Sequence, residues 1–118
     1  MKKDETYAYR IELMANQIKV LFGEVPDNLE DFACMSQISQ AEAKKYFIER
    51  FRIGKWRRTG IIWWNVIDGC PQFSDAVVDY YYNKKMAYYY IKRSQARTAL
   101  IFDEPAEHNV QLYGVNDY

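Results

Sequence analysis

The residues best suited to chemistry lie in one stretch, 60–93, which reads GIIWWNVIDGCPQFSDAVVDYYYNKKMAYYYIKR. It combines the adjacent pair Trp63 and Trp64 with the aspartates Asp68, Asp75 and Asp79 and six tyrosines. Aromatic rings offer an apolar face beside a polar handle, and carboxylates accept hydrogen bonds, so this combination is typical of a carbohydrate site. For Asp75 and Asp79 a role in turns or helix caps is favoured.

Other site chemistries find little support in the sequence. Cys34 and Cys70 are too few and too far apart to indicate a disulfide or a zinc site, so two unpaired and mostly buried thiols are expected. His108 is the only histidine, which argues against a Ser-His or His-metal constellation and leaves Cys70 without a base to activate it. The sequence therefore predicts no metal and no cofactor.

Length and charge limit the kinds of partner. The 118 residues fit one small domain or part of a larger one, and sixteen basic residues balance sixteen acidic ones. Because the net charge is zero, neither nucleic acid nor a membrane surface is expected as a partner. The basic segment RFRIGKWRR at 50–58 is interpreted as a solvated helix end. The sequence shows no apolar signal segment and no run long enough to span a membrane, so a soluble chain of unknown location is expected.

Two long helices are predicted in the first half. Apolar residues recur at steps of three and four in the first segment and predict a helix over about residues 5–22 with one buried stripe, namely Tyr7, Ile11, Met14, Ile18 and Leu21. Asp27 and Glu30 have the spacing of a capping box that opens a second helix over about 28–53. Ser39 and Glu42 repeat that spacing, so this helix is allowed a break near Ile38.

A strand and a third helix follow. Residues 60–67 are apolar at consecutive rather than alternating positions, which predicts a strand buried on both faces, as in a parallel sheet covered by helices. Parity places Trp64 with Ile62 on one face and Trp63 with Ile61 on the other. A helix over about 83–95 is predicted to bury Met86, Ala87, Tyr90 and Ile91.

Beyond residue 95 the pattern changes. Two short β-like runs, 99–102 and 110–115, are joined by a turn that contains Pro105 and predict a hairpin. A lone parallel strand and a lone hairpin leave backbone groups without partners. The sequence therefore indicates either a piece of a larger enzyme or a chain that pairs with another, for instance as a homo-oligomer through its strand edges.

The segments SQISQAEAKKYFIERFR and TGIIWWNVIDGCPQFSDAVVDYYYNKKMAYYYIKR, taken together, resemble the end of the catalytic barrel in glycoside hydrolase family two, on its β-mannosidase side. The resemblance covers about residues 7–95, and VQLYGVND resembles an early strand of the following sandwich more loosely. It implies an α/β fragment. Residues 1–95 would be the last helix–strand–helix units of a TIM barrel, and 96–118 the first hairpin of an immunoglobulin-like β-sandwich.

The resemblance also implies an activity. The parent would be a retaining exo-β-glycosidase, which needs two carboxyl groups about 5–5.5 Å apart. In the family both are glutamates on strands that would precede Met1, so this chain is expected to hold no catalytic residue and to be inactive alone. Its part would be the eighth-strand wall of a site for β-glycoside carbohydrate. The alternative is an interaction module that oligomerises or completes a split barrel in trans; a small carbohydrate-binding domain is a third possibility.

By the same resemblance, four residues would line the sugar. Trp64 matches the tryptophan on which the sugar ring stacks, and the peptide bond after that residue is often cis in related barrels. Asp68 matches an aspartate that would bind a sugar hydroxyl or orient a neighbour. Asn65 stands where glutamine is common, and Cys70 stands where tryptophan is usual, which removes an aromatic surface from the loop.

Overall fold

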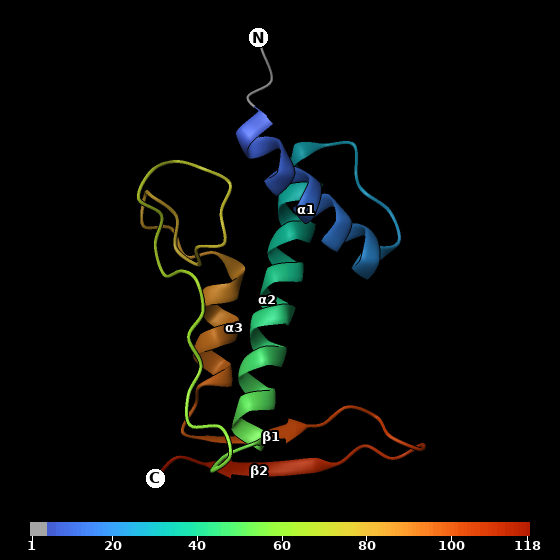
Figure 1. Cartoon of the computed structure of the whole chain (residues 1–118), viewed down its shortest axis with the longest axis vertical. Helices are drawn as coiled ribbons and strands as arrows, with labels where there is room; N and C mark the ends of the chain where they lie inside the picture. The colour runs from blue at the N-terminus through green and yellow to red at the C-terminus, as the bar shows by residue number, and fades with distance from the viewer. Residues whose placement is uncertain (1–4) are drawn as a thin grey trace.

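The computed structural model describes residues 5–118, with side chains from Ala8 onward. Three helices precede one hairpin: α1 (Glu5–Phe22), α2 (Leu29–Ile53), α3 (Met86–Ser94), β1 (Thr98–Phe102) and β2 (Leu112–Asn116). Figure 1 shows α2 as the central rod, with α3 alongside its lower half, α1 across its upper end and the hairpin beneath it. The long connection between α2 and α3 runs back up beside α3.

Helix α1 has the predicted bounds but buries little of its predicted stripe. It ends at Gly23, whose φ of 88° is a conformation that glycine adopts without a side-chain clash. Ile18 is fully buried, whereas Ile11 and Leu21 are 48% and 51% exposed; the side chain of Tyr7 lies outside the described part. In the described part of the chain α1 packs mainly on α2, and of its predicted stripe Ile18 is fully buried and Met14 partly buried.

Helix α2 starts one residue later than the predicted capping box. Asn28 is the N-cap, and its Oδ1 accepts a hydrogen bond of 2.8 Å from the backbone N–H of Asp31. The helix runs without the break allowed near Ile38. Ala41 and Ile48, seven residues apart, are the buried residues of this helix and lie on one face.

The core lies between α2, α3 and the connection that joins them. Its buried members come from all three segments and are Ala41, Ile48, Val77, Ala87 and Ile91. The predicted stripe of the third helix is confirmed: Ala87 and Ile91 are buried, and Met86 and Tyr90 pack against the same cluster. Trp63 also packs there and thereby brings the connection into the core.

The predicted hairpin is present and rests on the lower end of α2. Thr98 pairs with Asn116 and Phe102 with Leu112 in an antiparallel register. Ion pairs fasten it to the helix, from Arg50 to Asp103 and from both Arg52 and Lys55 to Asp117, the latter two at 2.8 Å. The hydrogen bond from Lys55 holds the pKa of the Asp117 carboxyl below its usual value. A domain boundary at residue 95 stays a prediction.

The predicted fold class is wrong. Residues 60–67 form no strand and join no sheet; the connection makes only isolated bridges, from Lys55 to Arg58, from Ile67 to Val78 and from Val78 to Lys84. Within the described range the only sheet is the two-stranded antiparallel hairpin, so the chain is neither an α/β unit with a parallel sheet nor recognisably the last units of a TIM barrel followed by a sandwich. A parallel strand needs a neighbour along its length, and residues 5–118 supply only one isolated parallel bridge to this segment, from Ile67 to Val78.

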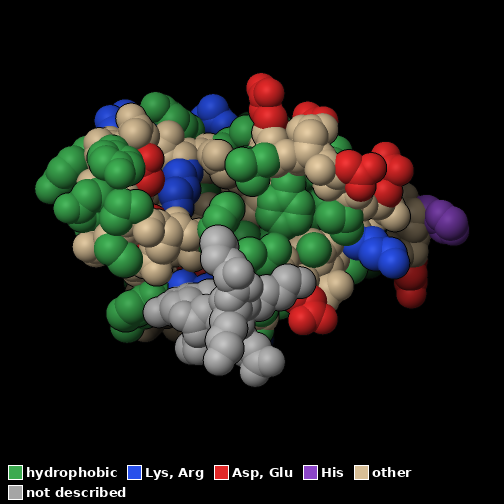
Figure 2. Space-filling view, turned by 90° about the horizontal axis from the view of Figure 1, so that it is seen from above, with side chains coloured by type: hydrophobic (Ala, Val, Ile, Leu, Met, Phe, Trp, Pro, Cys, Tyr) green, Lys and Arg blue, Asp and Glu red, His purple; other side chains and the backbone are tan. Residues whose placement is uncertain are grey.

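The molecule is open and exposes much apolar surface. Its radius of gyration is 16.6 Å, against about 13.5 Å for a compact domain of this length. Its accessible surface is 9450 Å², against about 6,700 Å² for a folded monomer of this size. Hydrophobic side chains occupy much of the face seen in Figure 2. No helix in the described part of the chain is long and apolar enough to cross a membrane.

The core position Ile48 and the exposed position Ile62 allow a matched stability test. Ile48 is 2% exposed and Ile62 is 99% exposed. We expect Ile48→Ala to lower the free energy of unfolding by about 2–5 kcal/mol, because it leaves a cavity beside α3. Ile62→Ala should change it by less than about 0.5 kcal/mol. Urea denaturation followed by circular dichroism measures both, and equal losses in the two variants would contradict the core described above.

Candidate functional site

The two tryptophans of the predicted site face in different directions. Trp63 is half-buried against the core, whereas Trp64 is 78% exposed. Ile61 and Ile62 follow the same alternation, since Ile61 is half-buried and Ile62 lies fully in solvent. The pairing of faces predicted from strand parity is therefore found without a sheet. The peptide bond from Trp64 to Asn65 is cis, as the resemblance implied.

Asn65 and Cys70 lie close to Trp64 in sequence but differ in setting. The Nδ2 group of Asn65 donates to the carbonyl of Ile67 at 3.2 Å, and its Oδ1 is buried and accepts no hydrogen bond from the described residues. Cys70 is a free thiol on an exposed loop, and Cys34 is free and exposed on α2. Both thiols are unpaired as predicted, but the expectation that they are buried is wrong, because one sits in a loop and the other on the outer side of a helix.

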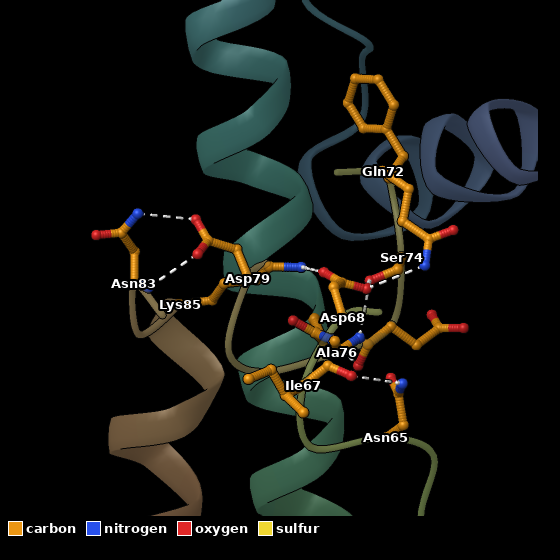
Figure 3. A network of polar contacts seen from close by, with 12 residues as sticks. Asn65, Ile67, Asp68, Gln72, Ser74, Ala76, Asp79, Asn83 and Lys85 are labelled. Atoms are coloured by element: carbon orange, nitrogen blue, oxygen red, sulfur yellow. Dashed lines mark hydrogen bonds and ion pairs between the residues drawn. The ribbon is translucent and has the colours of Figure 1, made fainter. Parts of the chain in front are cut away.

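Asp68 is buried and its carboxylate is fully engaged (Figure 3). Oδ1 accepts hydrogen bonds from Gln72 Nε2 at 3.2 Å and from the Ser74 hydroxyl. Oδ2 lies 3.3 Å from Nζ of Lys85, and the two side chains are 1% and 18% exposed. Of the two predicted roles, binding a sugar hydroxyl or orienting neighbours, the geometry corresponds to the second.

Backbone hydrogen bonds hold the rest of the connection together around Asp68. The N–H of Asp68 donates to the carbonyl of Val78 at 3.1 Å, and the N–H of Val78 donates to the carbonyl of Val66 at 2.9 Å. The N–H of Lys85 donates to the carbonyl of Val77 at 2.9 Å. Three passes of the chain are thereby joined without forming a regular sheet, and the loop that follows Trp64 has a defined shape.

Asp79 closes a turn rather than facing a ligand, as favoured from the sequence. Its carboxylate accepts from the backbone N–H of Asn83 at 2.8 Å and from the side-chain amide of Asn83 at 3.0 Å. These bonds, the side-chain bond above all, hold the pKa of Asp79 below its usual value. The turn delays α3, which begins at Met86 and not at about 83.

Three polar residues of α2 that the sequence reasoning missed hold the connection. Gln37 Oε1 accepts from the backbone N–H of Met86 at 3.0 Å, Gln40 Nε2 donates to the carbonyl of Asp75 at 2.7 Å, and Lys44 Nζ donates to the carbonyl of Trp64 at 3.0 Å. We name Gln37, Gln40 and Lys44 the polar seam. Their spacing of three and four residues places them on one helix face, and that spacing within SQISQAEAKK is the signal that could have revealed them.

Lys44 makes a second contact in the same place. Its Nζ lies 4.7 Å from the centroid of the Trp63 ring, within the range of a cation–π interaction. Partial burial lowers the pKa of the Lys44 ammonium, and the nearby charge of Asp75 opposes that shift. A single cation therefore bridges the ring of one tryptophan and the backbone carbonyl of the next.

A groove of about 940 Å³ lies along this seam, between α1, α2 and the loop at 72–75. Apolar side chains such as Met14, Leu21 and Phe32 line it together with Gln40 and Lys44. Trp64 is not part of its lining, so its ring faces open surface. Across residues 5–118 no group of three or more histidine, cysteine or acidic side chains is placed to hold a metal ion.

Comparison with known proteins gives no relative from which to transfer a role: no family model, no curated protein and no solved structure matches this chain.

Replacing Asp68 tests whether its carboxylate organises the loop. We expect Asp68→Asn to lower the free energy of unfolding by about 1–3 kcal/mol, because it leaves the half-buried ammonium of Lys85 without its counter-charge. The exposed loop residue Asp75 is the control, and Asp75→Asn should cost no more than about 0.5 kcal/mol. Urea denaturation of the two variants decides, and an Asp68→Asn chain as stable as the wild type would show that the carboxylate organises nothing.

Proposed function

We propose that this chain supplies one wall of the sugar site of a retaining exo-β-glycosidase, and that the catalytic carboxylates belong to another part of that enzyme. The resemblance of residues 7–95 to glycoside hydrolase family two supports the reaction class. The ligand is a β-glycoside, and Trp64 is the residue on which its ring stacks.

The observation that carries the proposal is the setting of Trp64. Its side chain is 78% exposed, yet its backbone is held from its carbonyl onward. Lys44 binds its carbonyl, and the loop that follows is fixed by the hydrogen bonds around Asp68. An exposed aromatic ring on an ordered backbone loses little conformational freedom when it stacks on a ligand, which favours binding.

The geometry of Asp68 supports an inactive wall rather than a complete active site. A retaining glycosidase needs a nucleophile and an acid/base about 5–5.5 Å apart, both accessible to the sugar. The carboxylate of Asp68 is buried and occupied by Gln72, Ser74 and Lys85, so it is not free to attack a glycoside. Binding without hydrolysis is the behaviour that this arrangement supports.

Two exposed tryptophans allow a controlled test of stacking. Trp64 and Trp56 are 78% and 87% exposed, but only Trp64 belongs to the proposed wall. We expect Trp64→Ala to weaken binding of a methyl β-mannoside by at least about fivefold, equivalent to about 1 kcal/mol of lost stacking. Trp56→Ala should leave the affinity within about twofold. Titration of the ¹⁵N-labelled full chain, followed by nuclear magnetic resonance, measures these weak affinities.

The same titration shows which results contradict the proposal. A wild-type chain unperturbed by β-mannoside, β-galactoside or β-glucosaminide would remove the sugar role of Trp64. Hydrolytic activity toward a chromogenic β-mannoside would instead contradict the inactive wall, provided that this activity co-purifies with the chain through successive columns.

A second candidate function is an interaction module, and the unpaired backbone of residues 60–63 favours it. Within the described part of the chain, none of the backbone N–H or C=O groups of these residues has a hydrogen-bond partner. Ile62 in their midst is 99% exposed. The molecule's surface exceeds that of a compact monomer by about 2,700 Å², more than the roughly 1,200–2,000 Å² that standard interfaces bury. A second copy that pairs its own extended segment here would cover part of that excess.

Association through this segment has its own test. Ile62 and Val20 are both exposed aliphatic residues, at 99% and 89%, but only Ile62 lies in the unpaired segment. If the segment pairs, light scattering should show a dimer at micromolar concentration, and Ile62→Lys should raise the dissociation constant at least about tenfold, because it places two charges near each other. Val20→Lys should change it by less than about threefold. A monomer at every concentration would exclude this candidate.

A further inference from the structure

Lys44 is the one member of the polar seam whose contacts reach both tryptophans. Its Nζ donates to the carbonyl of Trp64 at 3.0 Å and lies 4.7 Å from the centroid of the Trp63 ring. Gln37 and Gln40 bind backbone groups farther along the chain, at Met86 and Asp75.

These two contacts constrain Trp64 through its neighbour and its own backbone. Trp63 packs against the core cluster, so its ring is fixed on one side by apolar contacts and is covered by the ammonium of Lys44. The same ammonium fixes the carbonyl that follows the Cα of Trp64. With the Trp63 ring and the Trp64 carbonyl both held, the direction in which the Trp64 side chain leaves the backbone is set.

We propose that Lys44 is a positioning residue that sets the direction in which the Trp64 side chain leaves the backbone and hence where its ring meets a sugar. A role for Lys44 in sugar binding rests on the proposed function, whereas its contacts with Trp63 and Trp64 are present without a ligand. A positive charge is the required property, because a neutral side chain of similar length would neither attract the Trp63 ring nor bind a carbonyl as strongly.

Three substitutions separate the charge of Lys44 from its bulk and from its place on the helix. Lys44→Met keeps a long apolar side chain and removes the charge, and Lys44→Arg keeps a cation that binds carbonyls and stacks on indole. Lys45→Met removes the adjacent lysine, which is half-buried on the same helix. Circular dichroism verifies that each variant retains its helices, and Lys44→Arg keeps the inference testable if Lys44→Met fails to fold.

The ligand-free readout is the set of three indole N–H resonances of the full chain, assigned with Trp→Phe variants at 56, 63 and 64. We expect Lys44→Met to shift the signals of Trp63 and Trp64 and to leave that of Trp56 in place, because Trp56 lies beside Lys55 instead. Lys44→Arg should return both signals toward their wild-type positions, and Lys45→Met should shift neither. Unchanged Trp63 and Trp64 signals in Lys44→Met, or equal shifts in Lys45→Met, would overturn the inference.

The sugar titration then distinguishes this inference from the function on which it rests. With methyl β-mannoside as the probe, Lys44→Met should weaken binding by about fivefold and Lys44→Arg by less than about twofold. If the wild-type chain binds no sugar, the proposed function fails, and the indole signals still decide whether Lys44 positions Trp64. If the wild type binds and Lys44→Met binds equally well, the positioning role fails alone.

Discussion

One face of α2 determines the shape of everything between α2 and α3. The connection of more than thirty residues contains no helix or strand, so its polar backbone groups depend on side chains and on each other. Lys44 and Gln40 bind the connection at Trp64 and Asp75, and Gln37 binds the first residue of α3, Met86. Beside this polar seam, Ala41 and Ile48 bury against α3. Apolar and polar parts of the same helix thus act together, since the apolar part fixes α3 and the polar part fixes the chain that leads to it.

Local patterns predicted the helices well because their signals depend on few neighbours. The buried stripe of α3, Ala87 and Ile91, follows from spacing alone, and Gly23 ends α1 where its sequence position indicates. The prediction for residues 60–67 is wrong. A run of consecutive apolar residues predicts a strand buried on both faces, but such a strand is buried only where other elements cover both faces. Ile62 and Val66 carry the composition of a buried strand and lie exposed. The sequence cannot indicate which neighbours are present.

In the candidate site, too, features set by the local sequence were predicted and features set by distant residues were not. The opposite facing of Trp63 and Trp64 follows from backbone parity, a local property, and was predicted. The burial of Asp68 was not, because it depends on Ser74 and Lys85, which approach only once the loop has folded back on itself. Lys44 was missed for a similar reason. A lysine in a helix is ordinarily solvated, and only its proximity to two tryptophans twenty residues away gives it a particular role.

A sugar wall and a strand-pairing edge can occupy the same segment without competing. Hydrogen bonds between extended segments lie in the plane of the backbones, whereas side chains project to either side of that plane. A partner that pairs with residues 60–63 would satisfy their N–H and C=O groups and leave the exposed Trp64 ring free to stack. Pairing would also order the backbone just before Trp64, which Lys44 and the Asp68 network hold only from the carbonyl of Trp64 onward. A partner strand would therefore improve the sugar wall, because it would order the backbone on the side of Trp64 that is still unpaired.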